Sequence, residues 1–439
     1  MSENLIFILA ALTLLMFVLN VFYNGNTVES CLIFILTCLP LMNLKITPEA
    51  MGGFKTFDFI CFYGLIFLLK DFTTIQLKTR QNFYFVFFVI LSIILVIGGL
   101  ASEFPNRTFF SFIKFLSIFI FGRFLLISCY KDPSFHQRVI AALKASYLMA
   151  LVFLGLQFIF GLGFTFYPKL GPNTIDPIFH MVRFPGIFYD SQAHGQYLAM
   201  GSFLFLYVEE GTKRNVRLLN YLVFILAVIG LNLAGSRAPI GGFVIGLFAI
   251  LFILSGKYRL YGGIVIVLAI TFYMVIAPTT GVFQRAENLS EDYLFRKNLW
   301  EEALVISQEN SLLGIGSGNY QDHITRHNQD QYLEIEDGLF LYFDQPENGY
   351  LKILVEFGYI GFGVFALMLI IPLLKAIIGY FRNTFDRKVI FLMASLLSWA
   401  VAFSTVYSIS DYRIMIVMAV MIILIISYPE KQTTAEDEA

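Results

Sequence analysis

Long apolar segments divide this chain and limit what it can fold into. We count thirteen of them, and most approach the roughly 20 residues that a helix needs to cross a bilayer. They are apolar on every side, whereas the strands of a membrane barrel alternate apolar and polar residues. Because hydrocarbon cannot satisfy backbone N–H and C=O groups, helices are the remaining solution. The sequence therefore predicts an all-α polytopic transmembrane helix bundle with about 12–14 spans.

The predicted spans follow the apolar runs. They are 4–22, 28–45, 56–70, 82–101, 108–128, 139–161, 193–208, 216–234, 238–255, 260–277, 347–374, 388–407 and 412–428. This divides the chain into a first part of the bundle at 1–277, with about ten spans, one large extracytoplasmic loop at 278–346, a last part of the bundle at 347–428, and an acidic tail at 429–439.

Charge sets the orientation and excludes one class of partner. Basic residues concentrate in alternate connections, such as the one holding Lys213, Arg214 and Arg217, and the positive-inside rule places these in the cytoplasm. The acidic tail is then cytoplasmic and the N-terminus outside. Charged residues make up only 14% of the chain and the net charge is −1, so nothing favours nucleic-acid binding. The four cysteines all lie in apolar runs and are interpreted as packing residues.

The loop at 278–346 carries four basic residues against twelve acidic ones and is expected to contain short helices. Between 291 and 308, Tyr293, Trp300 and Leu304 share one helical stripe, which predicts an amphipathic helix lying on the bundle or the membrane surface. A glycine-rich break follows at 314–318, and the polar segment after it could act as a lid.

Two arginines at the exterior ends of spans are candidates for binding an anion. Arg237 lies in the short connection before the ninth span, and Arg183 lies in a turn with Pro and Gly before the seventh. A guanidinium can bond two phosphate oxygens at once and keeps its charge. The alternative for each is an ordinary interfacial arginine whose head reaches water.

Glu347 and Asn348 open the eleventh span at its exterior end. Partial desolvation there favours a neutral acid, which suits the carboxylate of Glu347 to act as a base. Asn348 could hold a substrate hydroxyl or the carboxylate itself. The alternative is a plain helix start, because Pro346 and an acidic first turn both suit a helix N-terminus.

Other polar residues are weaker candidates. His323 and His327 have i,i+4 spacing that could bind zinc, but histidines in loops are usually solvated, so no metal is predicted. Lys114 lies in the middle of the fifth span, where it is either paired or a contact for a lipid carrier. His194 begins the seventh span. The chain has neither a Gly-x-Ser-x-Gly elbow nor a P-loop, which argues against hydrolases and ATPases.

Taken in order, four landmarks resemble the O-antigen polymerase and O-antigen ligase superfamily over about residues 180–375. They are Arg183-x-x-Gly186-x-Phe188; Ser236-Arg237; Arg296-x-x-x-Trp300 with Leu313-Gly314-x-Gly316-x-Gly318; and Glu347-Asn348-Gly349-Tyr350-Leu351 with Glu356-x-Gly358-x-x-Gly361.

The resemblance implies a glycosyltransferase that needs neither metal nor cofactor and inverts the anomeric configuration. Its substrates would be an undecaprenyl-pyrophosphate-linked glycan donor and acceptor, used at the periplasmic face of the bacterial plasma (inner) membrane, among membrane lipids. Arg183 and Arg237 would bind the pyrophosphate. Glu347 would be the base where the family usually has histidine, although His323 or His327 could fold back instead. The implied substrate-binding residues are Asn348, Tyr350, Lys114, Ser236, His194 and Arg296.

Three functions stay open at this point. The first is a polysaccharide polymerase that joins lipid-linked repeat units, with a co-polymerase partner setting chain length, and the departure at Glu347 favours it. The second is an O-antigen ligase that transfers the glycan to lipid A core or to protein. The third is a transporter or flippase of lipid-linked glycans. Transporters usually show two related halves, which this sequence lacks.

Overall fold

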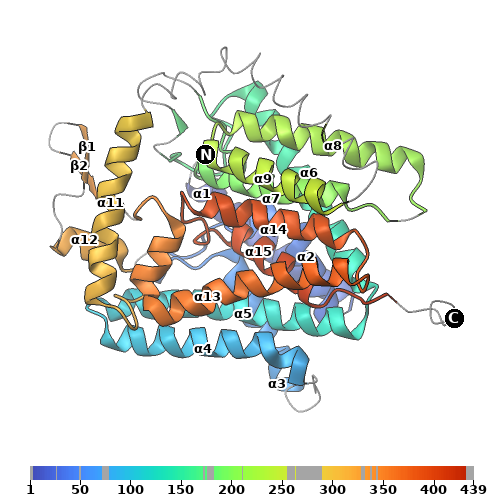
Figure 1. Ribbon diagram of the computed structural model, residues 1–439, viewed down its shortest axis with the longest axis horizontal. Coiled ribbons are helices and arrows are strands. Elements are labelled where there is room, and N and C mark those ends of the chain that lie inside the picture. Colours follow the sequence, from blue (N-terminus) through green and yellow to red (C-terminus); the bar gives the residue numbers. More distant parts are fainter. Residues whose placement is uncertain are drawn as a thin grey trace.

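The computed structural model is a bundle of helices, as predicted (Figure 1). It describes residues 3–25, 27–48, 51–71, 79–171, 174–175, 182–209, 211–254, 263, 289–327, 332–336, 339–342 and 345–431. In chain order the elements are α1 (Glu3–Tyr23), α2 (Val28–Thr37), η1 (Leu39–Leu41), α3 (Thr56–Asp71), α4 (Thr79–Ala101), α5 (Pro105–Lys131), α6 (Phe135–Phe160), α7 (Ser191–Ser202), η4 (Phe203–Leu206), α8 (Arg214–Leu233), α9 (Arg237–Ile253), α11 (Leu289–Glu309), α12 (Tyr320–His327), β1 (Tyr332–Glu336), β2 (Leu339–Tyr342), α13 (Gly349–Phe381), α14 (Val389–Phe403) and α15 (Tyr412–Ile426).

Length and composition mark this chain as a multi-pass membrane protein. Among the described residues, α1, α5, α6, α8 and α13 are each long and apolar enough to cross a membrane, and several shorter helices are equally apolar. Twelve of the thirteen predicted spans coincide with described helices, while the span predicted at 260–277 lies outside the described residues. The predicted span 28–45 is too long: α2 ends at Thr37 and gives way to the short 3₁₀ helix η1, which contains Pro40.

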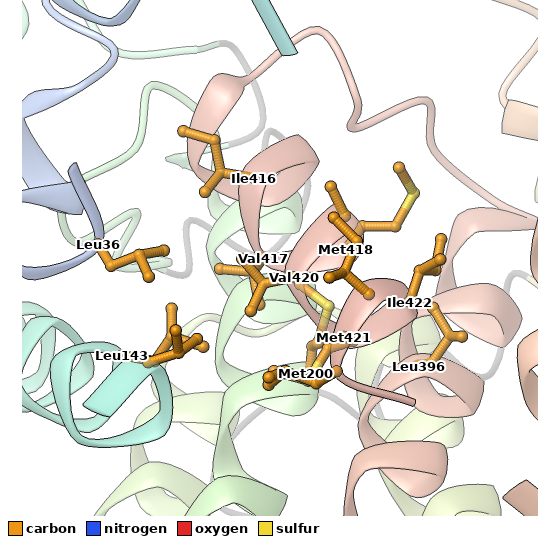
Figure 2. Close-up of a cluster of buried hydrophobic side chains, with 14 of the residues drawn as sticks. Leu36, Leu143, Met200, Leu396, Ile416, Val417, Met418, Val420, Met421 and Ile422 are labelled. Carbon is orange, nitrogen blue, oxygen red and sulfur yellow. The ribbon is translucent and has the colours of Figure 1, made fainter. Parts of the chain in front are cut away.

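The centre of the bundle is formed by α14 and α15. Helices α6 to α9 lie on one side of this pair and α4, α5 and α13 on the other (Figure 1). Every residue from Ile416 to Ile425 is buried, which explains why α15 is apolar on all faces. Figure 2 shows the side chains of α15 packing against Leu143 and Met200, from α6 and α7. By contrast, α1 is at the edge and exposes most of its apolar surface, which suits contact with lipid.

One end of the bundle, called here the loop end, carries the elements of the large loop. Helices α11 and α12 and the antiparallel hairpin β1–β2 lie there, whereas the C-terminal end of the described chain lies at the opposite end (Figure 1). The amphipathic helix predicted at 291–308 is present as α11, but its buried face was wrongly assigned: Leu299, Ala303 and Ile306 are buried, while Leu304 is 41% exposed. The stripe is displaced because α11 packs on α13.

A kink in α13 receives the glycine-rich break of the loop. Gly358 has φ +65°, a conformation favourable only for glycine, and it interrupts the helix. The freed backbone groups bond to the loop, because the N–H of Ile315 donates to the carbonyl of Val355 (2.9 Å) and that of Tyr359 donates to Ser311 (2.8 Å). Two glycine motifs that are separate in the sequence are therefore one structural joint.

Candidate functional site

Three helices gather around the last turn of α14 at the loop end. In α9, Gly242 packs against the backbone of Ser398, so that α9 and α14 run in contact from this end. In α13, Gly349 packs against the ring of Phe403. From α7, the side-chain amide of Gln196 donates to the carbonyls of Ala402 (3.2 Å) and Val406 (3.3 Å). The first turns of α7, α9 and α13 are thus brought to one place.

Arg183 is fixed against the turn that begins α9. The N–H of Phe184 donates to the carbonyl of Leu233 (3.0 Å), which ties the 183–188 segment to the end of α8. The side chain of Arg183, only 9% exposed, packs over Gly235, where an added Cβ would lie 3.0 Å from Arg183 Cγ. Gly235 lies two positions before Arg237, so Arg183 packs beside the turn that leads to Arg237. We refer to Arg183 and Arg237 as the arginine pair.

Arg237 occupies an unusual position for a cation. Ser236 has the extended backbone of an N-cap, so Arg237 is the first residue of α9. A positive side chain at a helix N-terminus opposes the helix dipole, at a cost of roughly 0.3–1 kcal/mol. The N–H groups of the first turn of a helix have no acceptor within the helix, and together with the dipole they attract anions. This turn is therefore electrostatically suited to an anionic ligand.

His194 lies next to both the 183–188 segment and the start of α9. It is fully buried, its ring is 5.6 Å from that of Phe188, and it covers Gly186. The following residue, Gly195, packs against Pro239 of α9. Neither ring nitrogen of His194 has a hydrogen-bond partner among the described residues. The imidazole is thus available for a further hydrogen bond.

Glu347 is held in a strained conformation beside Arg296. Its φ of +49° lies in the left-handed region, which non-glycine residues adopt at a cost of about 1–3 kcal/mol and often at functional sites. Its Oε2 lies 3.8 Å from Nη2 of Arg296 in α11, so the loop helix contributes a charge to the site. The alternative interpretation placed Glu347 in the first turn of a helix. In the structure, α13 begins two residues later, at Gly349.

Asn348 and Tyr350 make contacts within the protein. The Oδ1 of Asn348 caps α13 by accepting from the N–H groups of Tyr350 (3.0 Å) and Leu351 (3.2 Å). The hydroxyl of Tyr350 donates to the carbonyl of Ala400 (2.7 Å). These bonds fix the start of α13, and with it Glu347, against α14.

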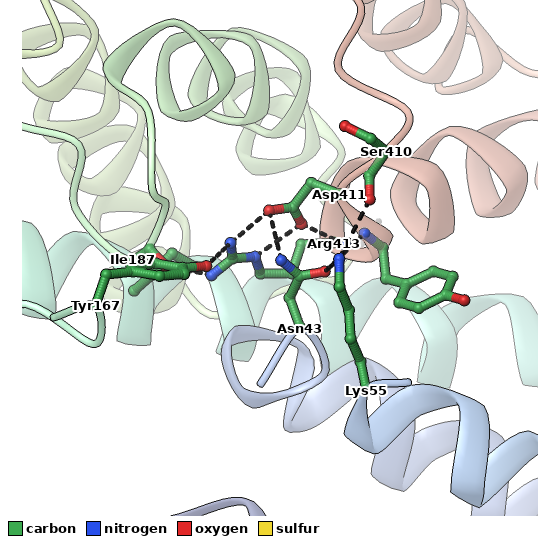
Figure 3. A network of polar contacts seen from close by, with 8 residues as sticks. Asn43, Lys55, Tyr167, Ile187, Ser410, Asp411 and Arg413 are labelled. Atoms are coloured by element: carbon green, nitrogen blue, oxygen red, sulfur yellow. Dashed lines mark hydrogen bonds and ion pairs between the residues drawn. The ribbon is translucent and has the colours of Figure 1, made fainter. Parts of the chain in front are cut away.

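Arg413 is a charged residue that the sequence prediction missed. Figure 3 shows it at the start of α15, where it pairs with Asp411 (2.5 Å), donates to the Tyr167 hydroxyl (2.8 Å) and bonds the carbonyl of Ile187. Its guanidinium also lies over the ring of Phe188. It clamps the segment that carries Arg183 to the core. The available signal was a charged pair at the start of an apolar run.

The Arg413 network extends to the other side of the α14–α15 connection (Figure 3). The amide of Asn43 donates to Asp411 (3.0 Å), and Nζ of Lys55 donates to Asn43 Oδ1 (2.7 Å) and to the carbonyl of Ser410 (3.3 Å). Burial lowers the pKa of Lys55 to about 8; the charge of Asp411 opposes this shift, and that of Lys114 adds to it.

A cavity of about 250 Å³ opens on that side, and we call it the lysine cavity. Its wall is mostly apolar and comes from α4, α5, α13, α15 and the α14–α15 connection. Lys114, Lys352, Glu356 and Tyr407 supply polar groups, with Nζ of Lys352 lying 4.5 Å from the centre of the Tyr407 ring and 3.8 Å from Glu356 Oε1. Such a mixed cavity fits an amphipathic ligand.

The structure thus separates the predicted residues into two groups. Lys114 lines the lysine cavity, together with Lys352, which the sequence prediction missed. Neither the arginine pair nor Glu347 is among the described residues that line it. The remaining predicted residues, Ser236, His194, Asn348, Tyr350 and Arg296, lie around the arginine pair or Glu347.

Part of the chain matches a family of known proteins. Residues 222–366 match the family described as O-antigen ligase, Wzy_C. The matched segment includes Arg237, Arg296 and Glu347, while Arg183, His194 and Lys114 precede it. No curated protein matches the chain.

Proposed function

Because residues 222–366 match the O-antigen ligase family, which points to glycan processing at membranes, we propose that this protein is a polysaccharide polymerase. It would join oligosaccharide repeat units carried on undecaprenyl pyrophosphate, at the outer face of the plasma membrane. The multi-pass bundle and the absence of a nucleotide-binding motif fit a donor that is a membrane lipid.

One observation supports the proposal: three sequence landmarks, distant in the chain, lie at or just before the starts of helices that pack near the C-terminal half of α14. Arg183 precedes α7, Arg237 begins α9 and Glu347 precedes α13. Contacts through Gly235, Gly242 and Gly349 bring these positions to one end of the bundle. Two permanent cations and one carboxylate at the same end of the bundle match the chemistry of glycosyl transfer from a pyrophosphate.

The proposed reaction is an inverting displacement at the anomeric carbon. A hydroxyl of the acceptor glycan attacks C1 of the donor sugar, and its proton passes to the carboxylate of Glu347. The bond between C1 and the pyrophosphate oxygen breaks, and the lipid pyrophosphate leaves with the electron pair. Arg183 and Arg237 stabilise the negative charge that grows on that oxygen. Arg296 would hold Glu347 in place, and His194 would bind a sugar hydroxyl.

The lysine cavity would serve the lipid part of a substrate. An undecaprenyl chain needs an apolar wall, while Lys114 and Lys352 can bind phosphate at its head. Because Glu356 is paired with Lys352, the net positive charge at this cavity is lower than that at the arginine pair. The cavity would thus contribute binding, and the arginine pair would contribute to the chemical step.

The test is reconstitution of the purified protein in liposomes with lipid-linked repeat units. The proposal expects a ladder of lengthened glycans on the lipid carrier, together with release of the lipid pyrophosphate. Transfer that occurs only to an added lipid A core or protein acceptor would indicate a ligase instead. Movement of intact units across the bilayer without bond formation would indicate a flippase and would overturn the enzymatic proposal.

A further inference from the structure

A second cluster of polar side chains lies outside the proposed site, where α12 meets the turn between α4 and α5. His323 and His327 occupy successive turns of α12, with ring centres 4.7 Å apart. Glu103 belongs to the turn, and its Oε2 lies 2.9 Å from Nε2 of His327. One ligand atom from each of these three residues lies within 4.8 Å of the other two.

Both sides of this cluster are already fixed to each other. Asn319, just before α12, donates its side-chain amide to Ser102 Oγ (2.5 Å) and Thr108 Oγ1 (3.0 Å). The hydroxyl of Ser102 donates in turn to the carbonyl of Ile315 (2.9 Å). Since Ser102 precedes Glu103 and the N–H of His323 bonds the carbonyl of Asn319 (2.9 Å), the backbone holds all three ligands in register. The backbone entropy lost on binding an ion is correspondingly small.

We propose that Glu103, His323 and His327 form a binding site for one zinc ion, with water as the fourth ligand. Two imidazoles and one carboxylate are a donor set that zinc adopts, and its ligand atoms then lie roughly 3.3–3.6 Å apart. The exposed side chains of Glu103 and His327 can rotate to close the remaining gap. Zinc binds neutral imidazole, so its affinity for this site should fall as the pH is lowered.

Neighbouring arginines already contact the carboxylates near this site, and one of them would compete with zinc for Glu103. Arg326 Nη1 lies 3.6 Å from the same oxygen of Glu103, and it would turn away when zinc binds. Asp322 is paired with Arg107 (2.5 Å) and so is not needed as a ligand. Zinc would thus replace a weak surface ion pair, which contributes at most about 1 kcal/mol.

The expected consequence is a tether for one wall of the lysine cavity. Ser317 and Gly318 line that cavity and lie between the Ile315 and Asn319 anchors. Zinc would hold α12 on the α4–α5 turn and reduce opening of this segment. The metal is structural in this proposal and takes no part in glycosyl transfer, so it stands independently of the proposed function.

The test uses full-length protein in nanodiscs, purified through a histidine-free tag and stripped with a chelator. Zinc is titrated in competition with a chromophoric chelator, and cobalt is used as a spectroscopic probe. We expect one zinc per chain with a micromolar or tighter dissociation constant, and visible cobalt bands typical of tetrahedral coordination. Hydrogen exchange across 317–327 should slow when zinc is added.

Four variants separate the proposed site from other binding. His323→Ala with His327→Ala should weaken zinc binding at least tenfold, and Glu103→Gln less. Thr325→Ala, on the same helix, is the matched control and should bind as the wild type does. His327→Cys should retain cobalt and add a thiolate charge-transfer band, which guards against mere misfolding. Equal zinc binding by the double variant and the wild type, or no binding by either, would overturn the proposal.

Discussion

The arginine pair and the lysine cavity lie at the same end of the bundle but are built differently. Arg183 and Arg237 are held by backbone bonds and glycine contacts in two tight turns, around side chains that keep their charge. Lys114 and Lys352 border an open volume of about 250 Å³ with a mostly apolar wall. The first region offers fixed charge with little freedom, and the second offers space with limited charge.

This difference fits the division between binding and chemistry proposed above. Charge that must act on a developing negative oxygen is effective only when it is preorganised, because reorganisation costs free energy at the moment of reaction. Binding a long lipid needs apolar area and tolerates movement. The Arg413 clamp between Ile187, Phe188 and Asp411 would serve the first requirement in the proposed reaction, because it fixes the segment that carries Arg183.

The largest effect is expected at the arginine pair. Arg237→Ala and Arg183→Ala should each lower kcat for elongation by about a hundredfold or more, since loss of one preorganised donor commonly costs roughly 10²–10³ in rate. Chain elongation on lipid-linked substrate measures this. Arg214→Ala, an exposed arginine at the start of α8, is the matched control and should elongate normally. Wild-type rates in both pair variants would remove the distinction between the regions.

The next effect concerns the base. Glu347→Gln should lower kcat by roughly a hundredfold, because the amide keeps the shape but cannot take a proton, and positioned bases contribute roughly 10²–10⁴. Glu347→His should recover part of the rate. The strained φ of +49° is kept in both variants, so thermal stability should change little. Full activity of the Gln variant would exclude this carboxylate as base and direct attention to His194.

A smaller effect is expected in the lysine cavity. Lys114→Gln should raise the KM for the lipid-linked donor about tenfold and leave kcat nearly unchanged, because the interaction is the same in ground and transition states. Lys297→Gln is the control, since its pair with Glu301 is a surface contact. A fall in kcat equal to that of the arginine variants would mean that Lys114 acts on the reacting phosphate.

The sequence predicted the helices well because most of their information is local. Apolar runs located twelve described helices, including the short α7, and an amphipathic stripe located the loop helix α11. Ends were less certain where the chain changes geometry, as at η1 after α2. The kink at Gly358 was not predicted, because it depends on backbone groups of Ser311 and Ile315 from a segment that is far away in the chain.

The site could be predicted only in part for the same reason. Arginines at span ends and Glu347 stand out in an apolar sequence, so their residue types were enough to select them. Arg413 and Lys352 did not stand out, because a charge near the start of a span is common. Only the fold shows that Arg413 is buried and that Lys352 faces the same cavity as Lys114.

The smallest effect, and the sharpest comparison, comes from two glycines with similar backbones. Gly235 (φ +63°) lies against Arg183, and Gly318 (φ +82°) lies against Ser111 in the wall of the lysine cavity. Alanine at either position meets the same left-handed strain, of about 1–2 kcal/mol, so both variants should lose similar thermal stability. Gly235→Ala should also displace Arg183 and lower kcat severalfold, whereas Gly318→Ala should mainly raise KM. Thermal unfolding and elongation kinetics on the same preparations measure both. If the two variants lost kcat equally, fixed charge and open volume would not be separate contributions to the reaction.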